Sequence, residues 1–209
     1  MLNTPDIPPI ILFAHGAGAP SGHPWIRAWS DRLSACGKVI TFDYPYMQQG
    51  RRTPDRQPQL IQAHAQAAKQ ALQDSSGAPL VLMGKSMGSR IGCHLAAETA
   101  DAGEVSIKAL VCFGYPLRSA SSGKSRAEIL RELRAPIMFI QGTRDPLCPL
   151  PELETLLPTL QAPNHLMVVD GADHSLVVAK RALASRKETQ HDVDERILQG
   201  IKTFLTMHG

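Results

Sequence analysis

The chain contains four cysteines, and none of them forms a C-x-x-C pair or shows the spacing of a zinc site. Cys93 and Cys112 lie in apolar segments, where a free cysteine behaves as a small hydrophobic residue. We expect both to be core residues. The scarcity of paired cysteines favours a reducing compartment.

Long hydrophobic runs are absent. No stretch approaches the roughly 20 apolar residues that a membrane helix needs. The first apolar run, Ile7–Ala14, is short, and no basic residue precedes it as it would in a secretory signal. We therefore expect a cytoplasmic protein that does not associate with a membrane.

No charge of one sign dominates. The 22 basic and 19 acidic residues give a net charge of +3, and they are interleaved. A nucleic-acid-binding protein more often shows a basic stripe or a known motif, so nucleic acid is not an expected partner. Arg51, Arg52 and Arg56 cluster in one segment, which we interpret as a solvated loop rather than an anion site. The oligomeric state stays open.

The 209 residues, 43% of them hydrophobic, suit one globular domain over residues 1–209. Short apolar runs alternate with longer segments of helical period. The runs predict six buried strands: Ile10–Ala14, Val39–Asp43, Leu80–Met83, Ala109–Phe113, Ile137–Ile140 and Leu166–Val169. The segments between and after them predict helices: Trp25–Cys36, Gln59–Gln73, Ser86–Ala100, Ala127–Leu133, Glu152–Leu157 and Asp192–Leu205.

Strand followed by helix, repeated along the chain, predicts an α/β fold with a mostly parallel, doubly wound sheet of about six or seven strands and helices on both faces. Tyr44–Pro58 and Arg118–Ser125 have the Pro, Gly and Ser content of loops. Neither is long enough to form a lid domain. In such a sheet a ligand binds at the carboxyl ends of the strands.

The motif Gly84-Lys-Ser86-Met-Gly88 directly follows an apolar strand and opens a helical segment. This is the setting of the G-x-S-x-G nucleophile elbow, in which a sharp, strained turn presents the serine hydroxyl above the sheet. Glycine at positions 84 and 88 leaves room that side chains would fill. The free N–H groups of the helix start favour developing negative charge, so Ser86 is the predicted nucleophile.

A serine hydroxyl needs a base near pH 7, and the base needs a group that orients it. In this kind of fold the chain order is serine, acid, histidine. Asp145 follows the fifth predicted strand, and His174 follows the sixth. We predict that Asp145 is the orienting acid and His174 is the base.

Other histidines and acids are less suited to these roles. The competing histidines lie within helices, at the start of a strand, among turn residues or at the chain end: His23, His64, His94, His165, His191 and His208. Asp170 and Asp173 are close to His174 in sequence. We interpret Asp173 as a loop residue that shapes the turn, and we favour Asp145.

The stretch His15-Gly-Ala17-Gly18 follows the first strand and is flexible enough to aim a backbone N–H at a carbonyl oxygen. We assign the oxyanion hole to the backbone N–H groups of Ala17 and Met87, with Gly18 as the substitute for Ala17. His15 is expected to hold this loop in place rather than to act as a second base.

With these motifs the chain resembles the α/β-hydrolase superfamily over nearly its whole length, through HGAGAP, GKSMGSR, GTRDP and GADHSL. It is particularly similar to a compact, lidless group near the dienelactone hydrolases, which includes the hydrolase-like domain of a subunit of a eukaryotic histone-acetyltransferase complex. Phe42–Met47, Gly50–Arg52 and Gly114–Leu117 strengthen that similarity, and Lys85 is shared with the group.

The resemblance implies a Ser86–Asp145–His174 triad and hydrolysis of carboxylic esters. The dienelactone hydrolases proper use a cysteine nucleophile, so the serine of this chain departs from them and puts dienelactone in doubt as its substrate.

Two ligand-binding patterns fail. A dinucleotide fingerprint that begins at Gly16 and Gly18 requires a third glycine where the chain has Ser21. Both Gly-Lys-Ser sequences lack the earlier glycine of a phosphate loop, because Pro79 and Arg118 stand there.

The sequence therefore predicts a serine hydrolase that cleaves a small carboxylic ester or thioester, with no cofactor and no metal. The alternative is a catalytically silent scaffold of the same fold that acts as a binding module.

Overall fold

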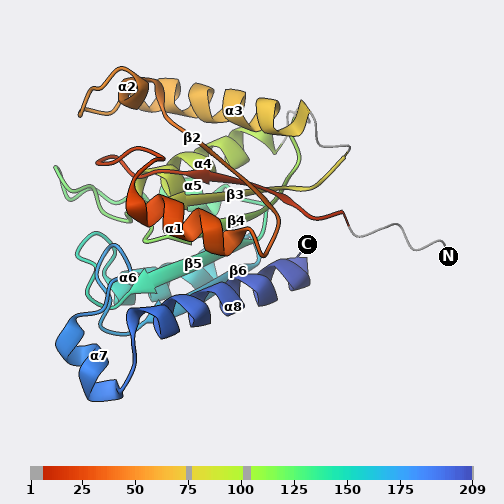
Figure 1. Cartoon of the computed structure of the whole chain (residues 1–209). Helices are drawn as coiled ribbons and strands as arrows, with labels where there is room; N and C mark the ends of the chain where they lie inside the picture. The colour runs from red at the N-terminus through yellow and green to blue at the C-terminus, as the bar shows by residue number, and fades with distance from the viewer. Residues whose placement is uncertain (1–6, 74–76, 101–104, 209) are drawn as a thin grey trace.

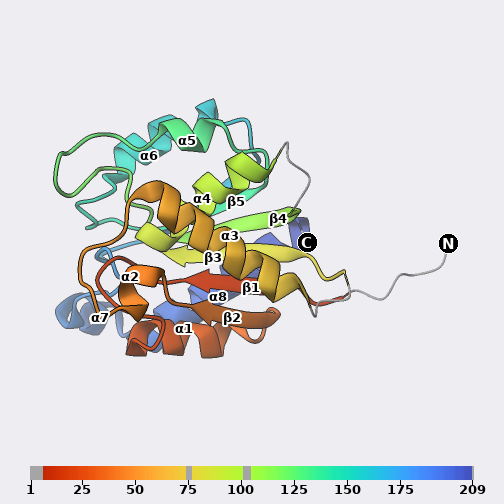
Figure 2. The same ribbon diagram turned by 90° about the horizontal axis from the view of Figure 1, so that it is seen from above.

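The computed structural model describes residues 7–73, 77–100 and 105–208. Within these ranges, six strands form one sheet in the order β2-β1-β3-β4-β5-β6, and every neighbouring pair is parallel (Figures 1 and 2). The parallel sheet confirms the predicted α/β architecture. The strands are β1 (Ile10–Ala14), β2 (Lys38–Phe42), β3 (Leu80–Lys85), β4 (Ile107–Phe113), β5 (Ile137–Gly142) and β6 (Asn164–Val169).

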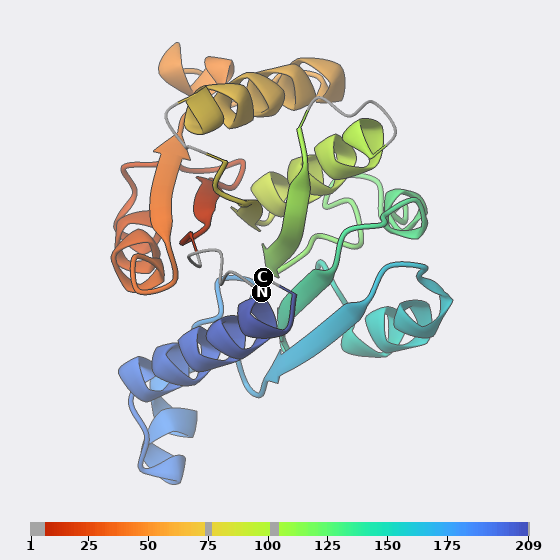
Figure 3. The ribbon, with the colours of Figure 1, turned by 90° about the vertical axis from the view of Figure 1, so that its right-hand side faces the viewer.

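Helices cover both faces of the sheet, as Figure 3 shows. The helices that follow the second, third, fourth and fifth strands pack on one face, and the first and last long helices pack on the other. In the described ranges no separate lid covers the sheet. The helices are α1 (Pro24–Leu33), α2 (Pro45–Gln48), α3 (Gln57–Gln73), α4 (Met87–Thr99), α5 (Glu128–Arg131), α6 (Leu150–Leu156), α7 (Lys180–Arg186) and α8 (Gln190–His208), with a 3₁₀ turn at Leu157–Thr159. None of the described helices is long and apolar enough to cross a bilayer.

Both faces of the sheet are core. Successive side chains of a strand point to opposite faces, so Leu12 and Leu82 pack toward α3 and α4, whereas Phe13 and Met83 pack toward α1 and α8. All four side chains are buried. This two-sided burial explains why the strands are continuous apolar runs in the sequence. Cys93 and Cys112 are free and buried in the core, as predicted.

Strand β1 lies between β2 and β3, so the strand order of the sheet reverses at β1. Strand β2 pairs with one edge of β1 and β3 pairs with the other, so the loops after β1 and β3 separate toward opposite faces. Such a switch point opens a crevice at the carboxyl ends of the strands, which are the arrowheads at the left of Figure 2. Ala14 and Gly84 are register partners. The chain therefore leaves β1 and β3 side by side at this edge of the sheet.

The observed bounds differ from the predicted ones at polar ends and in short elements. Strand β5 extends beyond its predicted end to include Gln141 and Gly142, and β6 begins before its predicted start, at Asn164 and His165. A strand end pairs through its backbone, whatever side chains it carries. Helix α2 lies inside the segment predicted as a loop, and α7 was not predicted. Only Leu183 is buried in α7, so that helix has no apolar stripe to read in the sequence.

Helix α3 carries a buried histidine, His64. The side chain of His64 is fully buried on α3, and its Nδ1 lies 3.1 Å from the hydroxyl oxygen of Tyr44. Its Nε2 is also buried and has no hydrogen-bond partner in the described part of the chain. Burial, with a smaller contribution from His15, lowers the pKa of His64 from 6.5 to about 3. The imidazole is therefore neutral in the folded protein at physiological pH.

This burial predicts a pH dependence of stability. Between pH 6.5 and pH 3 the unfolded chain binds a proton at His64 that the folded chain does not bind. The free energy of unfolding therefore falls as the pH is lowered, by up to about 1.4 kcal/mol per pH unit from this group. Urea titrations between pH 7 and pH 5 should show a shallower slope for His64→Gln than for the wild type. His191→Gln, at an exposed position, is the control, and equal slopes in all three proteins would contradict the prediction.

Candidate active site

Ser86 occupies the turn between β3 and α4 with φ +51° and ψ −111°. Positive φ is costly for a residue other than glycine and persists only where the surroundings enforce it. The backbone N–H of Ser86 donates to the carbonyl of Phe113 at the end of β4, at 3.0 Å. The turn is thus anchored to the neighbouring strand, and the helix that starts at Met87 points its free N–H groups at the space above Ser86.

Glycine is required on both sides of this turn. A Cβ at Gly84 would lie 2.3 Å from the backbone nitrogen of Ser89, and one at Gly88 would lie 2.4 Å from the carbonyl oxygen of Ala14. The contact at Gly84 is within the turn, as the sequence indicated. The contact at Gly88 is with the end of β1, so this glycine sets how closely α4 approaches the loop after β1.

The structure brings together the three residues predicted to act as nucleophile, base and acid. The Nε2 of His174 lies 2.8 Å from the Oγ of Ser86. The Nδ1 of the same ring lies 2.7 Å from an Oδ of Asp145. Because a carboxylate only accepts, Nδ1 carries the proton and Nε2 is free to accept the serine proton.

Asp145 is buried, and its carboxylate accepts hydrogen bonds from three groups. The side-chain amide of Gln141 donates to the same oxygen that faces His174, at 2.7 Å, and the backbone N–H of Leu147 donates to the other oxygen at 2.8 Å. Burial alone raises the pKa of Asp145. The hydrogen bond and charge of His174, with the donors from Gln141 and Leu147, outweigh burial and hold this pKa below its usual value. The carboxyl group is therefore ionised near neutral pH.

His174 comes from a distant strand. Strand β6 stands three positions from β3 in the sheet, about 14 Å at the usual strand spacing. The loop after β6 folds back across the ends of β5 and β4. A Cβ at Gly142 or at Gly114 would lie 2.7 Å from a carbonyl oxygen of this loop, that of Asp173 and that of His174 respectively. Two glycines at successive strand ends thus let the histidine reach the serine.

The competing acids have other partners. The Oδ1 of Asp173 accepts from the backbone N–H groups of Ser175 and Val177, at 2.8 and 3.0 Å, which closes the turn around His174. Asp170 is exposed and pairs with Arg186. The imidazole of His174 hydrogen-bonds to Asp145 and Ser86 and to neither of these acids.

The loop after β1 is held by His15 and Tyr46. The buried Nδ1 of His15 lies 2.6 Å from the carbonyl oxygen of Gly16, and its Nε2 accepts from the backbone N–H of Tyr44 at 3.2 Å. Burial lowers the pKa of His15. The Tyr46 hydroxyl donates to the carbonyl of Ala17 at 3.0 Å. These bonds fix the peptide next to Ser86 that was assigned to the oxyanion hole.

A family model described as an alpha/beta hydrolase domain matches residues 8–203. The chain belongs to this alpha/beta-hydrolase family. Solved structures share the fold at low sequence identity. A dienelactone hydrolase from Anabaena variabilis is 21% identical, with a TM-score of 0.68 over 96% of this chain and 86% of that one. Est1E from Butyrivibrio proteoclasticus, solved with ferulic acid bound, is 15% identical, with a TM-score of 0.70 over 99% and 92%.

An alpha-beta serine hydrolase homologue from Coxiella burnetii is also 15% identical, with a TM-score of 0.70 over 92% of this chain and 84% of that one. Membership in the family supports a hydrolase. At these identities the solved structures themselves establish the fold.

In this alpha/beta hydrolase a cavity of about 460 Å³ opens beside Ser86 and His174. The loop after β1 and the start of α1 form its largely apolar wall, which includes Trp25 and Ile26, and Lys85 also lines it. Sequence reasoning did not place Trp25 or Lys85 at the site. The position of Lys85 next to Ser86 was the available signal, whereas Trp25 was indistinguishable from a core residue of a helix face.

The arginines of the segment after β2 lie outside this cavity. Arg51 donates to Asp55 at 2.5 Å and to the side chain of Gln49 at 2.9 Å. Asp55 in turn accepts from the backbone N–H of Tyr46 at 3.0 Å. Arg51 thus closes its own loop, and Arg52 is exposed. These contacts agree with the interpretation of a solvated loop.

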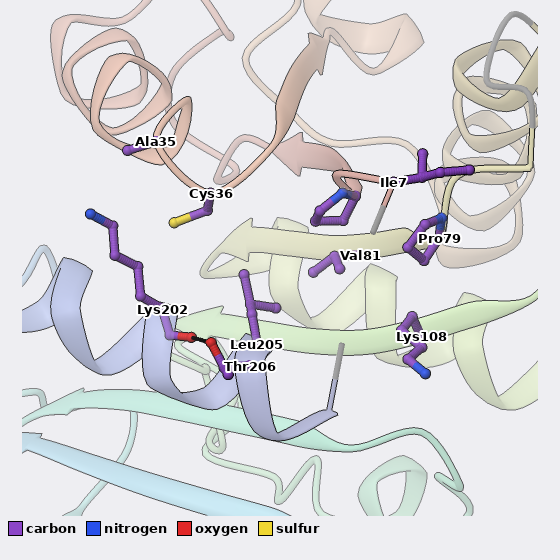
Figure 4. Close-up of a pocket in the computed structure, with 10 residues that line it drawn as sticks. Ile7, Ala35, Cys36, Pro79, Val81, Lys108, Lys202, Leu205 and Thr206 are labelled. Atoms are coloured by element: carbon purple, nitrogen blue, oxygen red, sulfur yellow. Dashed lines mark hydrogen bonds between the residues drawn. The ribbon is translucent and has the colours of Figure 1, made fainter. Parts of the chain in front are cut away.

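A second hollow, of about 400 Å³, lies at the opposite end of the sheet (Figure 4). Cys36, Lys108 and Lys202 line it, around an apolar floor that includes Val81 and Leu205. Burial raises the pKa of the Cys36 thiol against the opposing effect of Lys202.

The described residues contain no group of three or more histidine, cysteine, aspartate or glutamate side chains placed to hold a metal ion.

The loop after β6, which carries His174 and is called the histidine loop below, passes over Gly114. This contact predicts how a methyl group added at Gly114 changes the free energy of unfolding. Gly114 has φ +62°, and an added Cβ would lie 2.7 Å from the carbonyl oxygen of His174. Gly123 has φ +65° and no atom within 4 Å of such a Cβ, so it is a matched control for the backbone strain alone. We expect Gly123→Ala to lower the free energy of unfolding by about 1 kcal/mol. We expect Gly114→Ala to lower it by about 1–3 kcal/mol more, because crowding adds to strain. Urea titration measures both, and equal losses would show that the loop is not packed against Gly114.

Proposed function

We propose that this alpha/beta hydrolase cleaves small carboxylic esters or thioesters through an acyl-enzyme on Ser86. One observation carries the proposal: Ser86, His174 and Asp145 form a continuous line of hydrogen bonds of 2.8 and 2.7 Å at the mouth of a cavity. This line is the arrangement that activates a serine hydroxyl for attack on an acyl carbonyl.

The reaction begins when the Oγ of Ser86 attacks the carbonyl carbon and its proton passes to the Nε2 of His174. The ionised carboxylate of Asp145 keeps the other ring proton on Nδ1 and stabilises the imidazolium that forms. The negative charge that develops on the carbonyl oxygen is stabilised by the backbone N–H groups of Ala17 and Met87.

The tetrahedral intermediate then collapses. His174 donates its proton to the leaving oxygen or sulfur, the bond from that atom to the acyl carbon breaks, and the acyl group remains on Ser86. A water molecule gives a proton to His174 and attacks the acyl carbon. The carboxylic acid leaves, and Ser86 regains its proton.

The cavity favours a small acyl group. Its volume of about 460 Å³ falls in the range of small-molecule sites, and its wall is mainly apolar. Two structurally similar proteins support ester-type substrates, since one is a dienelactone hydrolase and the other, Est1E, was solved with ferulic acid bound.

The test is hydrolysis of short p-nitrophenyl esters. We expect Ser86→Ala to abolish the rate, with a loss on the order of 10⁶ in kcat as in other serine hydrolases. We expect Asp145→Asn to keep the fold and to lower kcat by about 10⁴, because an amide misorients the imidazole. Asp173→Asn is the matched control, since its amide oxygen still accepts from Ser175 and Val177.

A fluorophosphonate reagent, which labels activated serines, separates the two possible failures. Labelling of the wild type without ester hydrolysis would mean that the substrate class is wrong and the nucleophile is right. Absence of labelling would overturn the proposal and favour the silent binding scaffold. Near-normal turnover by Asp145→Asn would overturn the assignment of the acid.

A further inference from the structure

Lys85, the residue before the nucleophile, is a buried lysine that the proposed reaction does not use. It ends β3 and is 9% exposed. Because side chains alternate along a strand, Lys85 points with Met83 toward the α1 face, whereas Ser86 begins the turn. A lysine is rarely buried unless its ammonium has partners.

The partners of this ammonium belong to the histidine loop and to α1. The Nζ of Lys85 donates a hydrogen bond to the backbone carbonyl of His174. It also lies 5.7 Å from the centre of the Trp25 ring, within the range of a cation–π interaction. The indole N–H of Trp25 donates to the carbonyl of Ser175 at 2.9 Å. Lys85 and Trp25 therefore donate to two successive backbone carbonyls, those of His174 and Ser175.

Lys85 and Trp25 donate to carbonyl groups that have no backbone donor. No backbone N–H in the described ranges donates to the carbonyl of His174 or of Ser175. A carbonyl that is removed from water and has no donor is destabilising, and the carbonyl of His174 lies close against Gly114. The Lys85 ammonium supplies that donor, and it comes from the residue covalently joined to the nucleophile.

We propose that Lys85 is a positioning residue that, together with Trp25, clamps the backbone of His174 so that its ring stays in register with Ser86. The inference rests on the proposed function of the same site. Ser86 and Lys85 are neighbours in the chain. A shift of the turn at Ser86 therefore also moves Lys85, and the hydrogen bond from Lys85 moves His174 in the same direction. In proximity catalysis, a displacement of about 1 Å costs on the order of 10²-fold in rate, which is why such a clamp matters.

The charge state of Lys85 gives this role a pH signature. Burial lowers the pKa of Lys85 to about 8, while the carboxylates of Asp145 and Asp173 oppose the decrease. His174 and His23 are the other titratable groups that line the same cavity. Below pH 8 the ammonium is present and holds the carbonyl. Above pH 8 the neutral amine is a weaker donor, and the clamp loosens.

The experiment compares Lys85→Met, which keeps most of the side-chain length without the charge, with Lys85→Arg, which keeps a permanently charged donor. Lys108→Met is the matched control, because it removes an exposed strand lysine at the opposite end of the sheet. For a short neutral ester we expect Lys85→Met to lower kcat by roughly 10²-fold with little change in KM. We expect Lys85→Arg to recover most of that loss and Lys108→Met to match the wild type.

The pH profile distinguishes positioning from a merely structural role. The wild type should lose kcat above pH 8, Lys85→Met should lack this limb, and Lys85→Arg should keep its rate to higher pH. Trp25→Phe, which keeps the ring and removes the indole N–H, should lower kcat in the same direction and covers the case in which Lys85→Met fails to fold. An unchanged kcat and alkaline limb in Lys85→Met would overturn the proposal. A rise in KM alone would overturn it too, because Lys85 would then contact the substrate.

A readout without turnover separates this inference from the proposed function. The hydrogen-bonded Nδ1 proton between His174 and Asp145 gives a low-field proton resonance, assigned by its loss in Asp145→Asn. We expect that resonance to broaden through faster exchange in Lys85→Met and in Trp25→Phe, and to persist in Lys108→Met. If esters are not hydrolysed but the resonance responds in this way, the proposed function fails and the positioning role stands. An identical resonance in Lys85→Met and Lys108→Met would overturn the positioning role.

Discussion

The strained turn at Ser86 is the constraint around which the rest of the site is built. A serine with φ +51° is stable only because the backbone on either side is packed without space for a side chain at Gly84 and Gly88. The hydrogen bond from its N–H to Phe113 ties the turn to β4, and the contact of Gly88 with Ala14 ties α4 to β1. Three parallel strands thus fix one hydroxyl group.

His174 must cross the sheet to reach that hydroxyl. His174 follows β6, an edge strand, and its loop passes over the ends of β5 and β4, where Gly142 and Gly114 give it space. Asp145, at the end of β5, lies beneath this crossing and meets the ring from the side away from Ser86. The order of the hydrogen bonds, Ser86–His174–Asp145, thus differs from the order of the strands that carry these residues, because the loop after β6 places His174 between the other two.

The pKa values of the charged groups in the site depend on how far their partners offset the effect of burial. The carboxylate of Asp145 is removed from water, yet its pKa is low because His174, Gln141 and Leu147 all face it with donors. Lys85 is compensated less completely, so burial lowers its pKa to about 8. Its ammonium shares the cavity with His174 and Ser86. The cavity thus combines an apolar wall with the ammonium of Lys85 beside Ser86 and His174.

Much of this arrangement is readable from the sequence. Apolar runs followed by segments of helical period predicted all six strands and the two-sided cover, because a buried parallel strand is apolar along its whole length. The short helices α2 and α7 were missed, since neither has an apolar stripe. The motif around Ser86 and the strand-end positions of Asp145 and His174 were sufficient to predict that the three residues meet, because carboxyl ends of parallel strands share one edge.

The sequence by itself determined the alternation of strand and helix, the glycines of the turn at Ser86, and the chain order of Ser86, Asp145 and His174, because these depend on local backbone geometry and on strand direction. Only the tertiary structure decided which side chains support them. The contact of Lys85 with His174 joins residues that are 89 positions apart in the chain, and the contact of Trp25 with Ser175 joins residues that are 150 positions apart. Such contacts depend on strand order and on the packing of α1, which no local pattern encodes.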